Sequence, residues 1–352
     1  MHRPFAAALL SLALLPMGAA GQAPQRLFYS GHSLLDDPLP GDVAAIAASL
    51  GTPLQWSRQH LEGSSIRERN AALDVLAEWR APRVVQGGMY DTLIVTEQHT
   101  LVGNLVWNDS VRELRRVHER FIASNARGQT WFYASWLNLD NRDDPRRWIT
   151  YERAASQVWQ CLATRINTSL AAEGRPDRIA FLPAGALLAA LVERATQGPV
   201  IAGVSAVSPR ATIERLFRDD VHLSPLGSFF MSSLVYATLY GRSPAGAAVA
   251  EGIDDTAARA LQSVAWDLVQ QERTQRETLS LDACRERTQH FIAPYTAYVR
   301  DVVVCPAVGA PRAWLQWTNH RRQFMWALRS GAKVHPLRFD AATDKAYWLA
   351  PP

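Results

Sequence analysis

Short apolar segments alternate with amphipathic segments over residues 26–240, and this order constrains the fold more than any other feature of the chain. The apolar segments have the length and residue types of β-strands and are 27–30, 54–57, 92–96, 130–134 and 178–182. Between them, apolar residues recur at helical spacing in 42–50, 110–123, 148–172 and 184–197. Repeated strand and helix predict an α/β fold with a parallel central sheet and helices on both faces.

The ends of several helices carry recognisable signals. Gly51 and Gly198 follow two of the predicted helices, where glycine suits a left-handed cap. The last core helix is predicted over 225–240, with Ser224 as its N-cap and Gly241 at its end. In sheets of this kind, ligand-binding groups gather in the loops at the carboxyl ends of the strands.

Two such loops hold the residue types of a serine hydrolase. Ser33 follows the first strand, while Asp219 and His222 lie three residues apart just before the last core helix. Serine needs an adjacent base to become a nucleophile, histidine titrates near neutral pH, and a carboxylate can fix its tautomer. Each element also has a simpler interpretation: a Gly-x-Ser turn, or helix capping with surface charge. The hydrolase hypothesis requires Ser33 and His222 to meet.

On these residues the chain resembles the SGNH (GDSL-like) hydrolases. Gly31-His32-Ser33-Leu34 stands where that family has its Gly-Asp-Ser-like element, and Asp219-x-x-His222 matches the family's last block. The resemblance covers about residues 26–240 and implies a flavodoxin-like three-layer α/β/α fold. It also implies a serine esterase in which Ser33 is the nucleophile, His222 the base and Asp219 the residue that orients the base.

The resemblance further implies an oxyanion hole, and here the chain departs from the family. The backbone amides of Ser33 and Gly63 can stand for two of the donors. The usual Gly-x-Asn-Asp block is replaced by Thr96-Glu97-Gln98-His99, so that Gln98, Asn104 or the more distant Asn108-Asp109 would have to supply the side-chain donor. Losing one such donor can cost a factor of about a hundred or more in rate.

Other residues at this edge are candidates for substrate binding, namely His32, Glu97, Asn104 and Trp136. Glu97 could bind a substrate hydroxyl, hold His32 or anchor a loop, and Trp136 could line a pocket or fill the core. The chain has no metal-type spacing of cysteine and histidine, so no metal site and no cofactor are expected.

The first residues have the pattern of an export signal. A short positive start, an apolar stretch over 5–15 and small residues before Gly21 predict a signal peptide of residues 1–20, with cleavage after Ala20 or Ala23. The apolar stretch is too short to cross a bilayer, so we expect an exported, periplasmic or secreted protein without a stable membrane span. Cys284 and Cys305 are expected to form a disulfide that closes a loop, with Cys161 as a small buried apolar residue.

The character of the chain changes after the last core helix. We expect a hydrolase domain over 24–245 and, over 246–352, a mostly helical extension that packs on the core and includes a helix over 254–276. The 48% share of hydrophobic residues is enough for a sizeable core. The net charge of +4 is mild and no Lys/Arg run interleaved with aromatic residues is evident, so nucleic-acid binding is not expected.

The sequence thus predicts an exported serine hydrolase that cleaves a small-molecule or glycan ester through an acyl-enzyme, possible reactions including the deacetylation of glycans. Two alternatives remain open. A catalytically impaired relative could bind glycan or cell-envelope components through the same cleft, or a hydrolase could act on phospholipids through an apolar entry groove.

Overall fold

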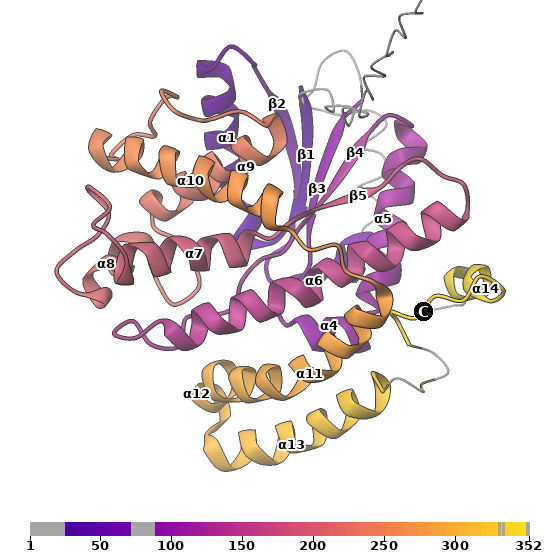
Figure 1. Ribbon diagram of the computed structural model, residues 1–352. Coiled ribbons are helices and arrows are strands. Elements are labelled where there is room, and N and C mark those ends of the chain that lie inside the picture. Colours follow the sequence, from indigo (N-terminus) through magenta and orange to yellow (C-terminus); the bar gives the residue numbers. More distant parts are fainter. Residues whose placement is uncertain (1–24, 72–88, 330–331, 333–334, 350–352) are drawn as a thin grey trace, which may run out of the picture.

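Five parallel strands form the centre of the protein, in the order β2-β1-β3-β4-β5 (Figure 1). The computed structural model describes residues 25–71, 89–329, 332 and 335–349, so the predicted signal peptide and its cleavage site lie outside the described residues. The strands are β1 (Arg26–Gly31), β2 (Gln55–His60), β3 (Thr92–Thr96), β4 (Gln129–Tyr133) and β5 (Ile179–Leu182). β3 is buried along its whole length, as expected for a central strand covered on both faces.

Helices cover both faces of this sheet, which confirms the predicted α/β class. They are α1 (Leu39–Ser49), α2 (Ile66–Ala71), α4 (Leu101–Trp107), α5 (Ser110–Ser124), α6 (Arg146–Ala172), α7 (Ala184–Gln197), α8 (Pro209–Leu216) and α9 (Pro225–Tyr240). In Figure 1, α1 and α9 lie together on one side of the sheet and α5 lies on the other. Because all strands run in the same direction, their carboxyl ends and the loops that follow meet at one edge.

The helix ends agree with the sequence signals except at one glycine. The hydroxyl of Ser224 accepts a hydrogen bond from the Gly227 amide at the start of α9, and Gly241 ends α9 at φ +63°. Gly51 follows α1 at φ +78°, as expected for a left-handed cap. The same prediction is wrong for Gly198, which has φ −99°. A side chain is excluded there for another reason, because a Cβ atom would lie 2.7 Å from the carbonyl oxygen of Arg194.

The C-terminal part is helical, as predicted, and continues from the core. Its elements are α10 (Asp255–Gln275), α11 (Leu281–Val299), η2 (Arg300–Val304), α12 (Cys305–Val308), α13 (Ala310–Ala327) and α14 (Asp344–Leu349). α10 packs on α9, and α11 packs on α6. α11 and α13 form a hairpin at the bottom of the view in Figure 1, and α13 also contacts α4.

Among the described residues, the helical run 281–308 is long and apolar enough, by length and composition alone, to cross a membrane. This run consists of α11, η2 and α12. Core helices of water-soluble folds pass the same test, and α11 lies between α6 and α13.

The disulfide joins Cys161 to Cys284, and the expected Cys284–Cys305 pair is therefore wrong. The segment between Cys284 and Cys305 is a continuous helical run through α11 and η2, not a loop. At 1.5 Å per residue, the two cysteines are about 30 Å apart, far beyond the reach of a disulfide. The Cα atoms of Cys161 and Cys284 lie 5.5 Å apart, so the bond ties α6 to α11 and leaves Cys305 as a free thiol.

Thiol titration of the unfolded, unreduced protein should therefore find one reactive cysteine, and Cys305→Ser should remove it. Cys161→Ala should lower the free energy of unfolding by about 3–5 kcal/mol, because the bond closes a long loop in the unfolded chain. Urea unfolding followed by circular dichroism measures this change. Equal stability of Cys161→Ala and Cys305→Ser would contradict the assigned pair.

Candidate active site

Ser33 lies at the carboxyl end of β1, in the first turn after the strand. A short 3-10 helix, η1 (Ser33–Leu35), begins there, and the preceding Gly31 allows close packing. A Cβ atom on Gly31 would lie 2.9 Å from Leu35 and 3.2 Å from Thr96, closer than side chains normally approach. The turn can therefore bend tightly over the end of the sheet and hold the Ser33 hydroxyl in one place.

His222 and Asp219 reach Ser33 from the loop before α9. The Nε2 atom of His222 lies 3.1 Å from Ser33 Oγ, and its Nδ1 atom lies 2.8 Å from Asp219 Oδ2. Because a carboxylate only accepts hydrogen bonds, Nδ1 carries the proton and Nε2 is free to accept from the Ser33 hydroxyl. The two loops, 189 residues apart in sequence, thus meet in the order hydroxyl, imidazole, carboxylate.

The Asp219 carboxylate is held in place and kept ionised by the same loop. Its Oδ1 atom accepts hydrogen bonds from the amides of His222, at 2.7 Å, and Val221, at 2.9 Å. Partial burial alone would raise the pKa of Asp219, but the bonds from these amides and from the His222 ring outweigh it and lower the pKa to about 2. Asp219 therefore carries its negative charge throughout the neutral range.

Trp136 holds the loop of Asp219 and His222 through a hydrogen bond. Its indole N–H donates to the carbonyl of Val221 at 2.8 Å, and the side chain is almost fully buried. The amide of Leu139 donates to the carbonyl of Asp220 at 2.7 Å. Trp136 also lines the cavity beside Ser33, so it both holds the histidine loop and forms part of the wall.

A small cavity of about 90 Å³ opens at Ser33 and His222. Its other walls include Asp37, Trp136 and Arg218. A larger hollow, of about 590 Å³, lies between α4 and the end of α13 and contains neither Ser33 nor His222. The smaller cavity is the one that the reactive groups face.

Glu97 and His32 lie beneath the site and bond to its backbone. The Oε1 atom of Glu97 accepts from the amides of Ile66, at 2.9 Å, and Gln98, at 2.8 Å. His32 accepts from the Leu34 amide at Nδ1, so its Nε2–H donates to the carbonyl of Glu97 at 3.1 Å. Burial lowers the pKa of His32 to about 3 and raises that of Glu97, an effect that Arg69 opposes. Both side chains are buried and bonded within the protein, which favours a scaffold role over contact with substrate.

Arg69 is a buried residue of the site that the sequence did not reveal. Its guanidinium donates to Ser30 Oγ at 3.1 Å, to the carbonyl of Ser64 at 2.8 Å, and to the carbonyl of Thr96. Burial lowers its pKa to about 10, so it stays protonated at neutral pH. Arg69 thereby joins the ends of β1 and β3 to the turn that contains Gly63. An arginine on a short helix gives no sequence signal that distinguishes it from a surface residue.

Gln98 is oriented by three donors. Its Oε1 atom accepts from the Thr100 amide at 3.0 Å, from the Thr100 hydroxyl, and from Asn104 Nδ2 at 2.7 Å. These bonds identify the oxygen end of the amide and leave the Nε2 hydrogens on the opposite end. Asn104 itself is buried, and its Oδ1 atom accepts from Asn108, so it positions Gln98 and has no free donor group directed to a ligand.

The turn that contains Gly63 follows β2, the neighbour of β1. The two strands pair up to Gly31 and His60, and the Leu61 amide donates to the carbonyl of Gly31 at 3.2 Å. Gly63 is exposed and adopts φ +62°, a backbone conformation that favours glycine. The pairing brings this turn beside the turn that carries Ser33.

His99 closes the Thr96–His99 segment, and no sequence pattern indicated a role for it. Its ring lies 6.1 Å from that of His32. Burial, and then the positive charge on protonated His222, lower its pKa to about 4, so His99 is neutral when His222 carries a proton. The Thr96-Glu97-Gln98-His99 segment therefore contributes an anchor, an oriented amide and a neutral imidazole to the site.

Comparison with known proteins finds only two distant likenesses among solved structures. No family model matches the chain, and no curated protein matches it in sequence. Two solved structures are similar. One is a DUF4886 family protein from Bacteroides uniformis ATCC 8492, with 14% identity and a TM-score of 0.45 over 73% of this chain and 97% of the other. The second is a "putative GDSL-like lipase" from Parabacteroides merdae ATCC 43184, with 12% identity and a TM-score of 0.39 over 63% and 97%.

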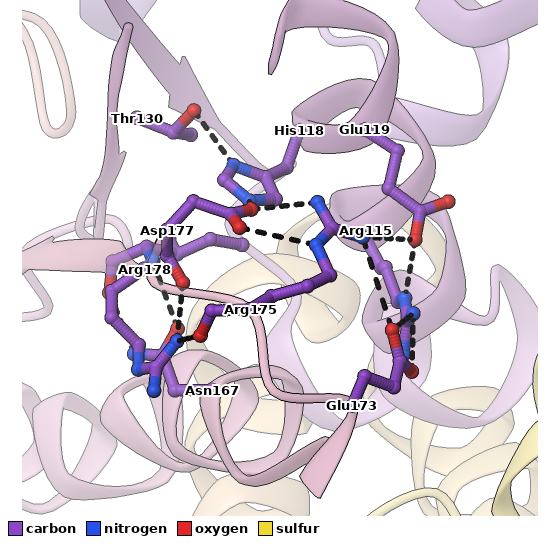
Figure 2. A network of polar contacts seen from close by, with 10 residues as sticks. Arg115, His118, Glu119, Thr130, Asn167, Glu173, Arg175, Asp177 and Arg178 are labelled. Carbon is purple, nitrogen blue, oxygen red and sulfur yellow. Dashed lines mark hydrogen bonds and ion pairs between the residues drawn. The ribbon is translucent and has the colours of Figure 1, made fainter. Parts of the chain in front are cut away.

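A second hydroxyl–imidazole–carboxylate chain lies elsewhere in the protein (Figure 2). His118 bonds Thr130 Oγ1 at 2.9 Å through Nδ1 and Asp177 Oδ2 at 2.8 Å through Nε2. His118 and Thr130 are fully buried. Arg175 donates to the same carboxylate and links it to further ion pairs through Glu119. Because Asp177 precedes β5 and Thr130 is the second residue of β4, this hydrogen-bonded chain lies towards the amino ends of the strands, away from Ser33. This arrangement is a structural cross-link.

Asp177 should therefore stabilise the folded protein at neutral pH and lose this effect in acid. Burial alone would raise its pKa, but hydrogen bonds from Arg175 and His118 lower it to about 2, against about 3.9 in an unfolded chain. Since the folded-state pKa is depressed, the stabilisation is complete above about pH 4 and is lost as the pH falls through about 2. At neutral pH we expect the free energy of unfolding of wild type to be about 1–2 kcal/mol higher than that of Asp177→Asn. This difference should disappear as the pH falls towards 2. Denaturant unfolding across this range measures it. A gap between wild type and Asp177→Asn that stays constant across this pH range would refute the assignment.

Proposed function

We propose that this protein is a serine hydrolase that cleaves esters of small acyl groups through an acyl-enzyme. The observation that carries the proposal is the contact of His222 with both Ser33, at 3.1 Å, and Asp219, at 2.8 Å. These distances are within the hydrogen-bonding range that proton transfer requires. The contacts are accompanied by a cavity at Ser33 and by a carboxylate that stays ionised at neutral pH.

In the first half of the reaction, Ser33 Oγ attacks the ester carbonyl while its proton passes to His222 Nε2. The carbonyl oxygen becomes an oxyanion, for which the amides of Ser33 and Gly63 and the Nε2 hydrogens of Gln98 are the proposed donors. Asp219 stabilises the imidazolium through Nδ1. When the C–O bond to the leaving group breaks, His222 gives its proton to the departing alkoxide, and an ester of Ser33 remains.

In the second half, water attacks this ester. His222 takes a proton from the water as the new bond forms, and the oxyanion is held by the same donors. Collapse of the intermediate breaks the bond to Ser33 Oγ, which recovers its proton from His222, and the carboxylic acid is released.

The shape and polarity of the cavity favour a short acyl group. The cavity of about 90 Å³ has room for acetyl, whereas a long acyl chain would extend beyond it. Asp37 and Arg218 on its walls suit a polar alcohol such as a sugar hydroxyl. The signal peptide expected at 1–20 would export the protein. We therefore propose an acetylated glycan outside the cell as the substrate class, in preference to a phospholipid.

Fluorophosphonate labelling tests the nucleophile, because it requires an activated serine. Wild type should react, and Ser33→Ala should not. The matched control is Ser228→Ala, which removes a hydroxyl from the same cavity and should still be labelled. Hydrolysis of p-nitrophenyl acetate should be lost with Ser33→Ala, and wild type should prefer this ester to the octanoate. An unreactive wild type would instead favour a protein that binds glycan without cleaving it.

Gln98→Ala tests the third oxyanion donor. We expect kcat for p-nitrophenyl acetate to fall by about ten- to a hundredfold with little change in KM, because the donor acts mainly in the transition state. Gln98→Glu keeps the shape but replaces the NH₂ group by a charged oxygen, so its kcat should fall at least as far. Gln98→Glu keeps the acceptor for Thr100 and Asn104 and should retain the wild-type melting temperature, whereas Gln98→Ala removes it and should lower the melting temperature. A fully active Gln98→Ala would exclude this role.

A further inference from the structure

Positive charge is concentrated near the C-terminus, which the mild net charge of the whole chain conceals. Residues 302–339 contain six arginine or lysine residues and no aspartate or glutamate, whereas the complete chain has a net charge of +4. Three of these arginines lie on α13, whose sequence APRAWLQWTNHRRQFMWA also contains three tryptophans. The expectation that no basic segment is interleaved with aromatic residues is therefore wrong for this helix.

α13 buries one face and exposes the other. Ala313, Trp317 and Phe324 recur at steps of four and seven residues and pack towards α11 and α4. The opposite face exposes large apolar side chains instead of the usual small polar ones. These are Trp314 at 56% exposure, Leu315 at 78%, Met325 at 40% and Trp326 at 69%.

Arginines accompany these exposed side chains. The Arg300 guanidinium lies 3.7 Å from the centre of the Trp314 ring, and that of Arg329 lies 4.4 Å from the Trp326 ring. Arg321 and Arg322 are exposed between the two tryptophans. The exposed Val308, at the tip of the hairpin, extends the apolar surface beyond Trp314. Asp301 pairs with Arg300 at 2.7 Å beside this surface, but α13 itself contains no acidic residue. Tryptophan and leucine flanked by arginine characterise helices that lie in the interface of an anionic membrane.

We propose that the exposed face of α13, formed by Trp314, Leu315, Arg321, Arg322, Met325 and Trp326, docks the protein on the surface of an anionic lipid bilayer. The apolar side chains would enter the boundary between headgroups and acyl chains, and the arginines would contact lipid phosphates. The hairpin would lie on the membrane and not cross it, since α11 is packed against α6.

Two other occupants fit the surface less well. A symmetric contact with a second copy would place two uniformly positive α13 helices against each other, and their charges would repel. A nucleic acid would match the charge but would leave Leu315 and Met325 without apolar partners. Lipid satisfies both properties at once.

The hairpin is also attached close to the candidate active site. Tyr295 of α11 accepts a hydrogen bond from the amide of Gly103 in α4 at 3.2 Å, and Phe324 of α13 packs on Trp107 at the end of α4. α4 begins directly after the segment that holds Gln98. Docking would thus hold the protein at the membrane through an element next to the site, whatever reaction the site performs.

Vesicle co-sedimentation tests the proposal with the full chain carrying Ser33→Ala, so that no hydrolysis alters the lipid. The protein should bind vesicles of phosphatidylglycerol mixed with phosphatidylcholine and not vesicles of phosphatidylcholine alone. Binding should weaken when salt is raised from about 0.1 M to 1 M, because the Debye length falls from about 10 Å to 3 Å. The double variant Arg321→Glu/Arg322→Glu should reduce binding at least about tenfold, since each arginine near the surface contributes roughly a factor of five.

The double variant Trp314→Ala/Leu315→Ser should also weaken binding to the anionic vesicles. Val207→Ser and Arg259→Glu, at exposed positions outside the hairpin, are the matched controls and should bind like the parent. Loss of binding in these controls, or binding that does not depend on lipid charge, would overturn the proposal. So would a dimer, measured by sedimentation velocity, that dissociates in the α13 variants. Binding of DNA that depends on Arg321 and Arg322 but not on Trp314, without binding of vesicles, would reassign the surface to nucleic acid.

Discussion

The candidate active site depends on two buried ionisable side chains, Glu97 and Arg69, beneath the carboxyl ends of the strands. Arg69 bonds the ends of β1 and β3 and the turn after β2, while Glu97 bonds the first residue of α2 and its own loop. Burying an ionisable group costs free energy unless its polar atoms are hydrogen-bonded. Removing any one of these hydrogen bonds would therefore destabilise the fold. These contacts fix three loops relative to one another, and the positions of Ser33, Gly63 and Gln98 follow from them.

The loop that carries Asp219 and His222, on the other side of the site from Glu97 and Arg69, is fixed largely by its own residues. Asp219 accepts two amides of its loop as well as the His222 ring, and Trp136 bonds the carbonyl of Val221 from the sheet side. A local pair therefore only has to be placed against Ser33 as a unit. The cap at Ser224 and the buried helix α9 provide that placement. Because each loop is fixed by its own contacts, Ser33 and His222 can meet at 3.1 Å although they are distant in sequence.

Local patterns in the sequence predicted much of this architecture. The strands, α7, α9 and the pairing of Asp219 with His222 depend on neighbours within a few residues, where periodicity and capping signals are strong. Apart from the cap predicted at Gly198, what failed depends on distant contacts. The cysteine pair was wrong because a helical run was taken for a loop, so that Cys284 bonds Cys161 across two helices. Arg69, His99 and the three donors around Gln98 likewise acquire their roles only when separate loops come together.

Geometry alone does not distinguish a reactive histidine from a structural one in this protein. His118 has a hydroxyl and a carboxylate at distances of 2.9 and 2.8 Å, similar to those of His222. The difference lies in access and surroundings. His118 is fully buried and Arg175 occupies its carboxylate, whereas the His222 side chain is 31% exposed beside a cavity. A proton moved from Thr130 would leave a buried alkoxide to which, in the part of the chain that the structure describes, only His118 is hydrogen-bonded. Charge that develops near Ser33 is instead proposed to meet backbone and side-chain amides. A hydrogen-bonded chain of hydroxyl, imidazole and carboxylate is therefore not enough to mark a catalytic site. The site must also stabilise the charge that forms after the proton is transferred.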